Sequence, residues 1–437
     1  MTLQARRILY LSFVILFFAA APPLVLYTAG FRYDFAYNRV VETGSLVVKS
    51  EPAGATVYLN GKRYRDSTPT IINTILPGKI KLLVEKEGYH SWEKELAIKP
   101  RVTAFEEGIT LFAQSSPETI IGRPIAGYWW NRTRDKLAYT TPENTLRLYN
   151  ALNQKDALIA NLSDSPSAAV AWSPHEDAFV FSRAAKNGFL EFIIVNAQAP
   201  ERSIAANAVA GGRLTDIQWD PRTSSSLYAL NRSRELVRLN YLLATERTVS
   251  EGPLLSYLAE GSRIVMISES GAQEPRLSWI NPAEASTVHL LPAVAVSESH
   301  RLVLTNSPYI ALYNEREHEL LIVDPGAAAT SPEAEPVAIS GVSEYLFTEA
   351  GRALVYSDGF ALYARTLTTP LSVLPRAYET GTLITRYSKP LSGLAASDRG
   401  GHVFYAVDGE LRASEVGEAS DPRSTTLLSG VRGASGL

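Results

Sequence analysis

The chain contains no cysteine, which excludes a disulfide framework, a thiolate metal site and a thiol nucleophile. Histidine is scarce as well: the chain has six, scattered along its length, so no nucleophile, base and orienting group can be assembled from the sequence. The formal net charge is only −3, which gives no general reason to expect a nucleic-acid partner. What remains is a chain of 437 residues and ordinary composition, long enough for two or three compact units.

Recognised catalytic motifs are also missing. No nucleotide-binding glycine loop, dinucleotide fingerprint or G-x-S-x-G elbow occurs. The pairs His175–Glu176 and His318–Glu319 could open a zinc-binding helix signature, but the fourth position after each histidine is Phe179 or Ile322. Both pairs are therefore predicted to be surface turns, and we expect no catalytic residue, metal site or cofactor.

Four aspartates are the remaining catalytic candidates. Asp216, Asp220, Asp358 and Asp408 could converge if the chain folds around a central channel. A solvated or strand-capping role is the expected one for each. The segments "SDGFALY" and "VDGELRA" around the last two keep only the Asp-Gly turn of the sialidase box, and a hairpin explains that turn without chemistry.

An uncharged run covers Ile8–Phe31, about 24 residues or roughly 36 Å of helix, which is enough to cross a bilayer. Tyr10 and Tyr27 stand near its two ends, where aromatic rings prefer the membrane interface. Pro22–Pro23 is expected to kink or end the helix locally. The run predicts a transmembrane signal-anchor helix over residues 8–29, followed by a linker over 30–43.

A cleaved signal peptide is the competing interpretation, with Arg6–Arg7 as its basic region and Ala19–Ala21 as its small-residue site. The continuous anchor is preferred because it also accounts for the apolar "LVLYTAGF" that cleavage would leave behind. A tail over residues 1–7 has no room for a folded domain, so we expect it in the cytoplasm and the bulk of the chain outside.

The stretch "GSLVVKSEPAGATVYLNGKRY" alternates apolar and polar residues around turn residues, which is typical of short strands. Asn60-Gly61 predicts a type I′ hairpin, because that turn needs positive φ at both central positions. "KIKLLVEK" and "SWEKELAI" predict a second hairpin around Gly88-Tyr89. About six short strands between residues 44 and 112 would form a small β-sandwich.

The same residues resemble a PEGA domain. Pro52-Ala53-Gly54-Ala55 follows Glu51, and Asn60-Gly61, Thr68-Pro69, Pro77-Gly78, Gly88-Tyr89 and Trp92 occur in the order of that family. The resemblance covers 44–112 and implies a β module of surface and envelope proteins that displays or binds, with no enzymatic role. Lys62, Arg63 and Arg65 follow the hairpin and could meet lipid headgroups or an anionic polymer, although a solvated loop is the simpler expectation.

Residues 113–437 show internal repetition with a mean spacing of about 44 residues, the period of a four-stranded propeller blade. A strand near "GITLFAQS" or the tail after Thr425 could close a ring. Seven predicted hairpins recur: "KLAYTTPENTLRLYN", "AFVFSRAAKNGFLEFIIVN", "SLYALNRSRELVRLN", "RIVMISESGAQEPRLSWIN", "YIALYNEREHELLIVD", "ALVYSDGFALYAR" and "HVFYAVDGELRAS".

Aromatic-led turns such as "WSPHEDAFVF" and "WDPRTSSSLYAL" resemble the blade openings of TolB-like and WD-repeat propellers. That resemblance implies a seven-bladed β-propeller over 113–437. We expect Trp130, Trp172, Trp219 and Tyr257 to fill the wedges between blades, in preference to forming an aromatic cage for a ligand.

The sequence thus predicts an all-β protein of the cell envelope behind an N-terminal transmembrane helix. Its expected job is non-catalytic binding or scaffolding, with the bilayer as one partner and a protein or envelope glycan as another. The alternative is an extracytoplasmic propeller hydrolase or lyase acting on polysaccharide. A sensor is a third hypothesis, and it would need a partner within the membrane because so few residues precede the anchor.

Overall fold

The computed structural model describes residues 3–28, 30–34, 38–114, 116, 118–162, 169–175, 177–184, 189–270, 273–283, 288–291, 294–330, 336–348, 353–367, 381–397, 401–416 and 423–429. Glu176, the hairpin turns expected near residues 186 and 272, and the tail beyond 429 lie outside these ranges. Two compact units divide the chain: the first holds residues 1–118, 409–414 and 423–432, and the second holds the remainder.

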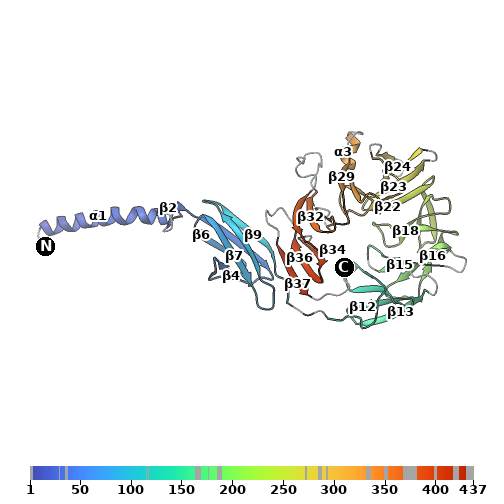
Figure 1. The fold of residues 1–437 in the computed structure, drawn as a ribbon, viewed down its shortest axis with the longest axis horizontal. Helices are drawn as coiled ribbons and strands as arrows, with labels where there is room; N and C mark the ends of the chain where they lie inside the picture. The colour runs from blue at the N-terminus through green and yellow to red at the C-terminus, as the bar shows by residue number, and fades with distance from the viewer. Residues whose placement is uncertain are drawn as a thin grey trace. The chain divides into compact units, whose positions relative to one another are not determined.

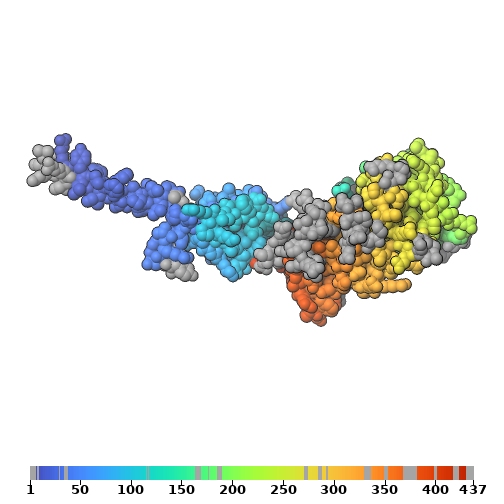
Figure 2. Space-filling model, turned by 90° about the horizontal axis from the view of Figure 1, so that it is seen from above, coloured from blue at the N-terminus to red at the C-terminus, as the bar shows by residue number. Residues whose placement is uncertain are grey.

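Helix α1 spans Leu3–Thr28 and carries the predicted anchor (Figure 1). Its segment Leu9–Thr28 is the one helix in the described part of the chain that is long and apolar enough to cross a membrane. None of that segment is buried against other parts of the chain (Figure 2). Of the two effects expected at Pro22–Pro23, an end of the helix is wrong, since both prolines lie inside it. Each proline lacks a backbone N–H and so removes one helical hydrogen bond. In apolar surroundings the other backbone groups of a helix are still favoured to bond within it.

The C-terminal end of α1 is held by Arg32. Its guanidinium stacks 3.6 Å from the centroid of the Tyr27 ring, and Nη1 donates to the Tyr27 carbonyl at 2.8 Å. A cation at this end of a helix satisfies a free carbonyl and complements the helix dipole. Arg32 belongs to a two-stranded hairpin, β1 (Phe31–Asp34) and β2 (Arg39–Glu42), which occupies the region predicted to be a linker.

Two sheets form the small β domain that follows. β3 (Gly44–Glu51) lies between β6 (Thr70–Ile75) and β9 (Thr103–Thr110), antiparallel to the first and parallel to the second. The second sheet has the order β5-β4-β7-β8, with β4 Thr56–Leu59, β5 Lys62–Arg63, β7 Gly78–Glu85 and β8 Trp92–Ile98.

Inward-facing residues of both sheets form one apolar core, as the period-two pattern predicts. The predicted turn is confirmed: Leu59 pairs with Lys62, and φ is 49° at Asn60 and 77° at Gly61. The hairpin of β7 with β8 is also confirmed. The buried core residues are Leu46, Val48, Ala55, Val57, Ile72, Ile80, Leu82, Val84, Trp92, Leu96, Ile98, Ile109 and Leu111.

Seven four-stranded antiparallel sheets follow in the described residues, each a meander of consecutive strands. We number them array sheets 1 to 7. Sheet 1 is β10 (Gly127–Trp130), β11 (Lys136–Thr140), β12 (Thr145–Asn150) and β13 (Lys155–Asn161); sheet 2 is β14 (Val170–Trp172), β15 (Ala178–Ala184), β16 (Leu190–Asn196) and β17 (Ile204–Ala205); sheet 3 is β18 (Thr215–Trp219), β19 (Ser226–Leu230), β20 (Leu236–Asn240) and β21 (Thr245–Ser250); sheet 4 is β22 (Leu254–Glu260), β23 (Arg263–Ser270), β24 (Gln273–Ile280) and β25 (Val288–Leu290).

The remaining three sheets complete the array. Two short helices, α2 (Ala206–Val209) and α3 (Pro325–Thr330), lie in its connections. Sheet 5 is β26 (His300–Val303), β27 (Ile310–Asn314), β28 (Glu319–Val323) and β29 (Val337–Ser340); sheet 6 is β30 (Glu344–Phe347), β31 (Ala353–Ser357), β32 (Ala361–Thr366) and β33 (Thr382–Arg386); sheet 7 is β34 (Leu391–Ala396), β35 (His402–Val407), β36 (Glu410–Glu415) and β37 (Ser424–Ser429).

All seven predicted hairpins are the second and third strands of these sheets. Of the two segments that the sequence left open for ring closure, the structure describes residues 108–114 of the first and residues up to 429 of the second. Residues 108–110 lie in β9, and Ser424–Ser429 is the fourth strand of sheet 7, paired with β36.

The array is propeller-like, because neighbouring sheets follow one another about a common centre from β12 to β32 (Figure 1). First strands of successive sheets contact each other: β14 with β18, β18 with β22, β22 with β26, and β30 with β34. Six apolar clusters in the described residues each join two consecutive sheets, from the pair 1 and 2 to the pair 6 and 7.

The middle strands are buried on both faces for this reason. Along β15, Phe179 and Phe181 face the cluster shared with sheet 1, while Ala178 and Val180 face the cluster shared with sheet 3. Alternate side chains therefore serve opposite neighbours, and the strand reads as a continuous apolar run.

Aromatic side chains of the first strands hold adjacent sheets together. Trp172 Nε1 donates to the Trp129 carbonyl at 3.0 Å, and Trp219 Nε1 donates to the Ala171 carbonyl at 2.9 Å. Tyr257 takes the same place between sheets 3 and 4, where its hydroxyl donates to the carbonyl of Tyr228 at 2.7 Å.

Three of the four predicted wedge residues, Trp172, Trp219 and Tyr257, thus pack between sheets. In the first sheet Trp129, the residue before Trp130, packs against the cluster shared with sheet 2, and the wedge role of Trp130 stays a prediction. Successive side chains of a strand point to opposite faces, so Trp130 faces away from the cluster that Trp129 contacts.

A polar clamp joins sheets 4 and 5. Glu260, 7% exposed, accepts from Thr305 N at 2.7 Å and pairs with Arg263 at 3.0 Å. Arg263 also donates to backbone carbonyls of the loop between β26 and β27, including Ser307 at 2.8 Å. The clamp therefore buries an ion pair whose charges are further satisfied by backbone groups.

Candidate functional site

Asp220 is fully buried at the end of β18 and has a structural role. It pairs with Arg222 at 3.2 Å and Arg238 at 2.9 Å, and accepts from the Tyr228 hydroxyl at 3.2 Å. Burial by itself would raise the pKa of Asp220, but the hydrogen bonds of Arg222 and the charges of both arginines outweigh it and hold the pKa below its ordinary value. A carboxylate that is ion-paired and has a lowered pKa is ionised near neutral pH, so it cannot serve as a proton donor there.

Asp358 and Asp408 both lie in hairpin turns, as predicted. Asp358 accepts from the backbone N–H groups of Phe360 and Ala361 at 2.9 and 2.7 Å. Burial would raise the pKa of Asp358, but these bonds lower it overall. Asp408 has φ of 50° and precedes Gly409 at 74°, the pair of positive angles that a type I′ turn requires.

Asp216 differs from the other three because it lies at a β-bulge in β18, a first strand of the array. Its φ is 50°, and the pairing with β19 shifts between Thr215 and Gln218. Its side chain reaches solvent, yet the surrounding groups desolvate the carboxyl enough to raise its pKa. A strained residue with a raised pKa on an inner strand is the kind of position that binding or catalysis uses.

The four aspartates lie in separate turns and bulges, and Asp216, Asp220 and Asp358 accept hydrogen bonds from groups of their own sheets. Among the described residues, no group of three or more His, Asp or Glu side chains could hold a metal ion. His175 and His318 are exposed turn residues, and Phe179 and Ile322 are buried in strands. The Tyr313 hydroxyl lies 3.1 Å from His318 Nδ1.

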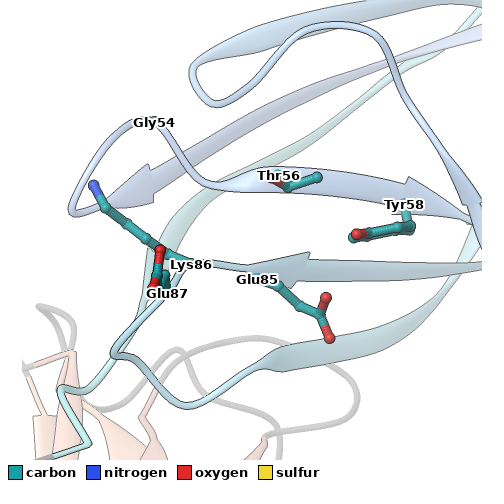
Figure 3. A pocket seen from close by; sticks show the side chains of 6 residues that line it. All are labelled: Gly54, Thr56, Tyr58, Glu85, Lys86 and Glu87. Atoms are coloured by element: carbon teal, nitrogen blue, oxygen red, sulfur yellow. The ribbon is translucent and has the colours of Figure 1, made fainter.

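An open hollow of about 620 Å³ lies on the outer face of the small β domain (Figure 3). Thr56 and Tyr58 project from β4, and Glu85 projects from the adjacent β7, where it stands directly opposite Thr56 in the pairing. The full lining is Gly54, Thr56, Tyr58, Glu85, Lys86 and Glu87.

Lys86 closes one end of this hollow, because its Nζ donates to the carbonyl of Ala53 in the turn before β4. The carboxylates of Glu85 and Glu87 and the hydroxyls of Thr56 and Tyr58 are the chemically active groups that remain. They can accept hydrogen bonds from hydroxyl or ammonium groups, and the Tyr58 ring offers a face for stacking.

The sequence reasoning did not single out this hollow. It drew attention to Lys62, Arg63 and Arg65, which are exposed beside β4 but do not line it. The available signal was the alternation in "ATVYL", which places Thr56 and Tyr58 together on the face opposite the buried Val57.

Residues 43–106 match the model of the PEGA domain, in agreement with the order of turns in that segment. No curated protein matches the chain. The chain is also similar to solved structures. One is the β-propeller domain of Cps50 (Swd1) from Myceliophteria thermophila, with 14% identity and a TM-score of 0.39, covering 71% of this chain and 89% of that one. A quinonprotein alcohol dehydrogenase-like protein from Bacteroides thetaiotaomicron is similar at 11% identity and a TM-score of 0.39, covering 88% of this chain and 94% of that one.

Proposed function

We propose that this protein is a membrane-anchored, extracytoplasmic binding or scaffold protein of the cell envelope. α1 crosses the membrane with the N-terminus in the cytoplasm, and the PEGA domain stands close to the bilayer. The seven array sheets are the blades of a closed propeller, whose rim turns recognise a protein or an envelope glycan. The observation that carries the proposal is an unburied apolar helix leading directly into a PEGA domain and a propeller-like array.

The helix end supports the anchored topology. Tyr27 and Arg32 stack on each other where the apolar segment stops, and an aromatic ring with a cation is suited to the headgroup region. The hairpin of β1 and β2 follows at once, leaving a short connection before β3.

A binding role is supported by the way the candidate acids are used. Asp220 and Asp358 have lowered pKa values and bonds within their own sheets, which suits structural carboxylates. The turns between the strands of the array remain for recognition, because loops on a rigid scaffold are common sites of binding.

Asp216 is the observation that favours the alternative, a hydrolase or lyase acting on polysaccharide. A carboxyl with a raised pKa can act as a general acid. In this alternative, Asp216→Asn abolishes polysaccharide turnover, and in the binding role it leaves partner recovery intact.

Two measurements test the proposal. Alkaline extraction of membranes should leave the full chain in the pellet, and protease added to intact cells should digest the array but not the first residues. Affinity recovery from solubilised membranes should then be compared between the intact protein and one lacking residues 113–437. Recovery of the same partners by both would show that the array is not the recognition surface.

A further inference from the structure

An apolar strip crosses the outer face of the β6-β3-β9 sheet in the PEGA domain. Val47 in β3 stands directly opposite Ile71 in β6 and Phe105 in β9, so the three side chains form one row on the same face. Ile71 is 59% exposed and Phe105 is 64% exposed, while Val47 between them is half-buried. The neighbours along these strands, such as Val48 and Ile72, point the other way into the core.

Polar rows border the strip on both sides. Ser45 and Thr103 are paired in the row before it. In the row after it, Lys49 and Glu107 form an ion pair at 2.8 Å, with side chains 52% and 45% exposed. The strip is therefore an isolated apolar surface, and its bordering charges sum to zero.

The size of the strip limits what can cover it. A stable complex in solution buries about 800 Å² on each partner, whereas three side chains supply at most a few hundred Å². A freely diffusing protein would not be held by so small a contact. A partner that is already confined beside the strip needs a much smaller contact area, because tethering raises its effective concentration to the millimolar range.

A second copy of this chain is such a partner, provided that α1 anchors it as in the proposed function. The same helix and the same short connection place the strip of each copy at the same height above the bilayer. Its face is self-complementary under a two-fold axis, since apolar side chains meet apolar side chains and the neutral Lys49–Glu107 row adds no net repulsion.

We infer that two membrane-anchored copies pair face to face through Val47, Ile71 and Phe105. The pairing is isologous and brings the two β6-β3-β9 sheets together at about 10 Å, the usual spacing of packed sheets. Phe105, 64% exposed, is the largest of the three side chains.

The absence of native cysteine makes cross-linking unambiguous. Thr103→Cys places a thiol in the polar row beside the strip, and Lys79→Cys places one on the outer face of the other sheet as a matched control. Packed sheets lie too far apart for a disulfide, so a bismaleimide with a spacer of about 8 Å is used on membranes containing the full chain.

The expected result is a cross-linked dimer at least tenfold more abundant for Thr103→Cys than for Lys79→Cys. Adding Phe105→Lys to the Thr103→Cys chain should reduce the dimer to the control level. Adding Ala97→Lys, on the outer face of the other sheet, should leave it unchanged. Phe105 projects outward, so its replacement leaves the core intact, and equal amounts of both double variants in the membrane verify this.

Equal cross-linking at the two positions would overturn the inference. A membrane-bound Thr103→Cys chain that neither cross-links nor reacts with a small maleimide would also overturn it, because another protein or the array of the same chain would then cover the strip. If alkaline extraction releases the chain, the anchor itself fails and the inference falls with the proposed function; retention in the membrane without the dimer refutes the pairing alone.

Discussion

Removing the carboxylate of the clamp between sheets 4 and 5 should destabilise the array strongly. Glu260→Ala leaves the side chain of Arg263, 13% exposed, without its counter-charge. It also removes the acceptor for the buried N–H of Thr305. Breaking a buried ion pair costs about 3 to 5 kcal/mol, because the remaining charge stays desolvated.

Urea unfolding followed by tryptophan fluorescence measures this cost, because five of the six tryptophans lie in the array. With a denaturant slope of about 3 kcal/mol per molar, a loss of about 3 kcal/mol or more lowers the array midpoint by about 1 M. The matched control is Glu315→Ala, which breaks the pair of Arg301 and Glu315 with side chains 62% and 59% exposed. An exposed pair contributes about 0 to 1 kcal/mol, so the control midpoint should move by about 0.3 M or less.

The double variant Glu260→Ala with Arg263→Ala measures the interaction free energy between these two side chains. It should cost less than the sum of the two single changes, since each single change leaves the other charge buried. Equal midpoint shifts for Glu260→Ala and the Glu315→Ala control, or strictly additive single changes, would refute this reasoning.

Trp219→Phe should lower array stability by about 1 to 2 kcal/mol, because the Ala171 carbonyl loses its donor, and a urea midpoint within error of wild type would contradict this. Lys94→Ala should lower the melting temperature of the PEGA domain by several degrees, because it leaves the part-buried Glu106 carboxylate unpaired, whereas Lys79→Ala, whose side chain is 80% exposed, should not. The lowered pKa of Asp220 means that its stabilising contribution is complete above the ordinary value of 3.8 and is lost as pH falls through the folded-state value; unfolding between pH 5 and 2 should therefore be less pH-dependent in Asp220→Asn, and an unchanged profile would contradict the assignment.

The order of the strands was predictable because it depends on local patterns. Asn60-Gly61 is a hairpin signal that needs no tertiary information, and the repeated hairpins follow from their regular spacing. The seven four-stranded sheets of the described residues agree with that repeat.

Other features were not predictable, because they depend on which face a residue occupies or on contacts between distant segments. Trp129 and Trp130 are adjacent and chemically identical, and only the register with β11 decides which one faces the cluster shared by sheets 1 and 2. The exposed strip needs the parallel pairing of β3 with β9, whose residues lie more than fifty positions apart in the sequence. The Glu260 clamp likewise joins sequence-distant loops through backbone groups that no side-chain motif reveals.

The alternation of buried side chains along the middle strands has a consequence for how this protein can diversify. Each of sheets 2 to 6 packs on both of its neighbours through residues of its strands, and the six clusters of the described residues use few side chains from the turns between strands. Insertions or substitutions in one turn therefore disturb at most the clusters that its sheet shares with adjacent sheets. Folding cooperativity is then confined to neighbouring sheets. Such a scaffold can acquire a new ligand at one rim while the rest of the molecule retains its architecture.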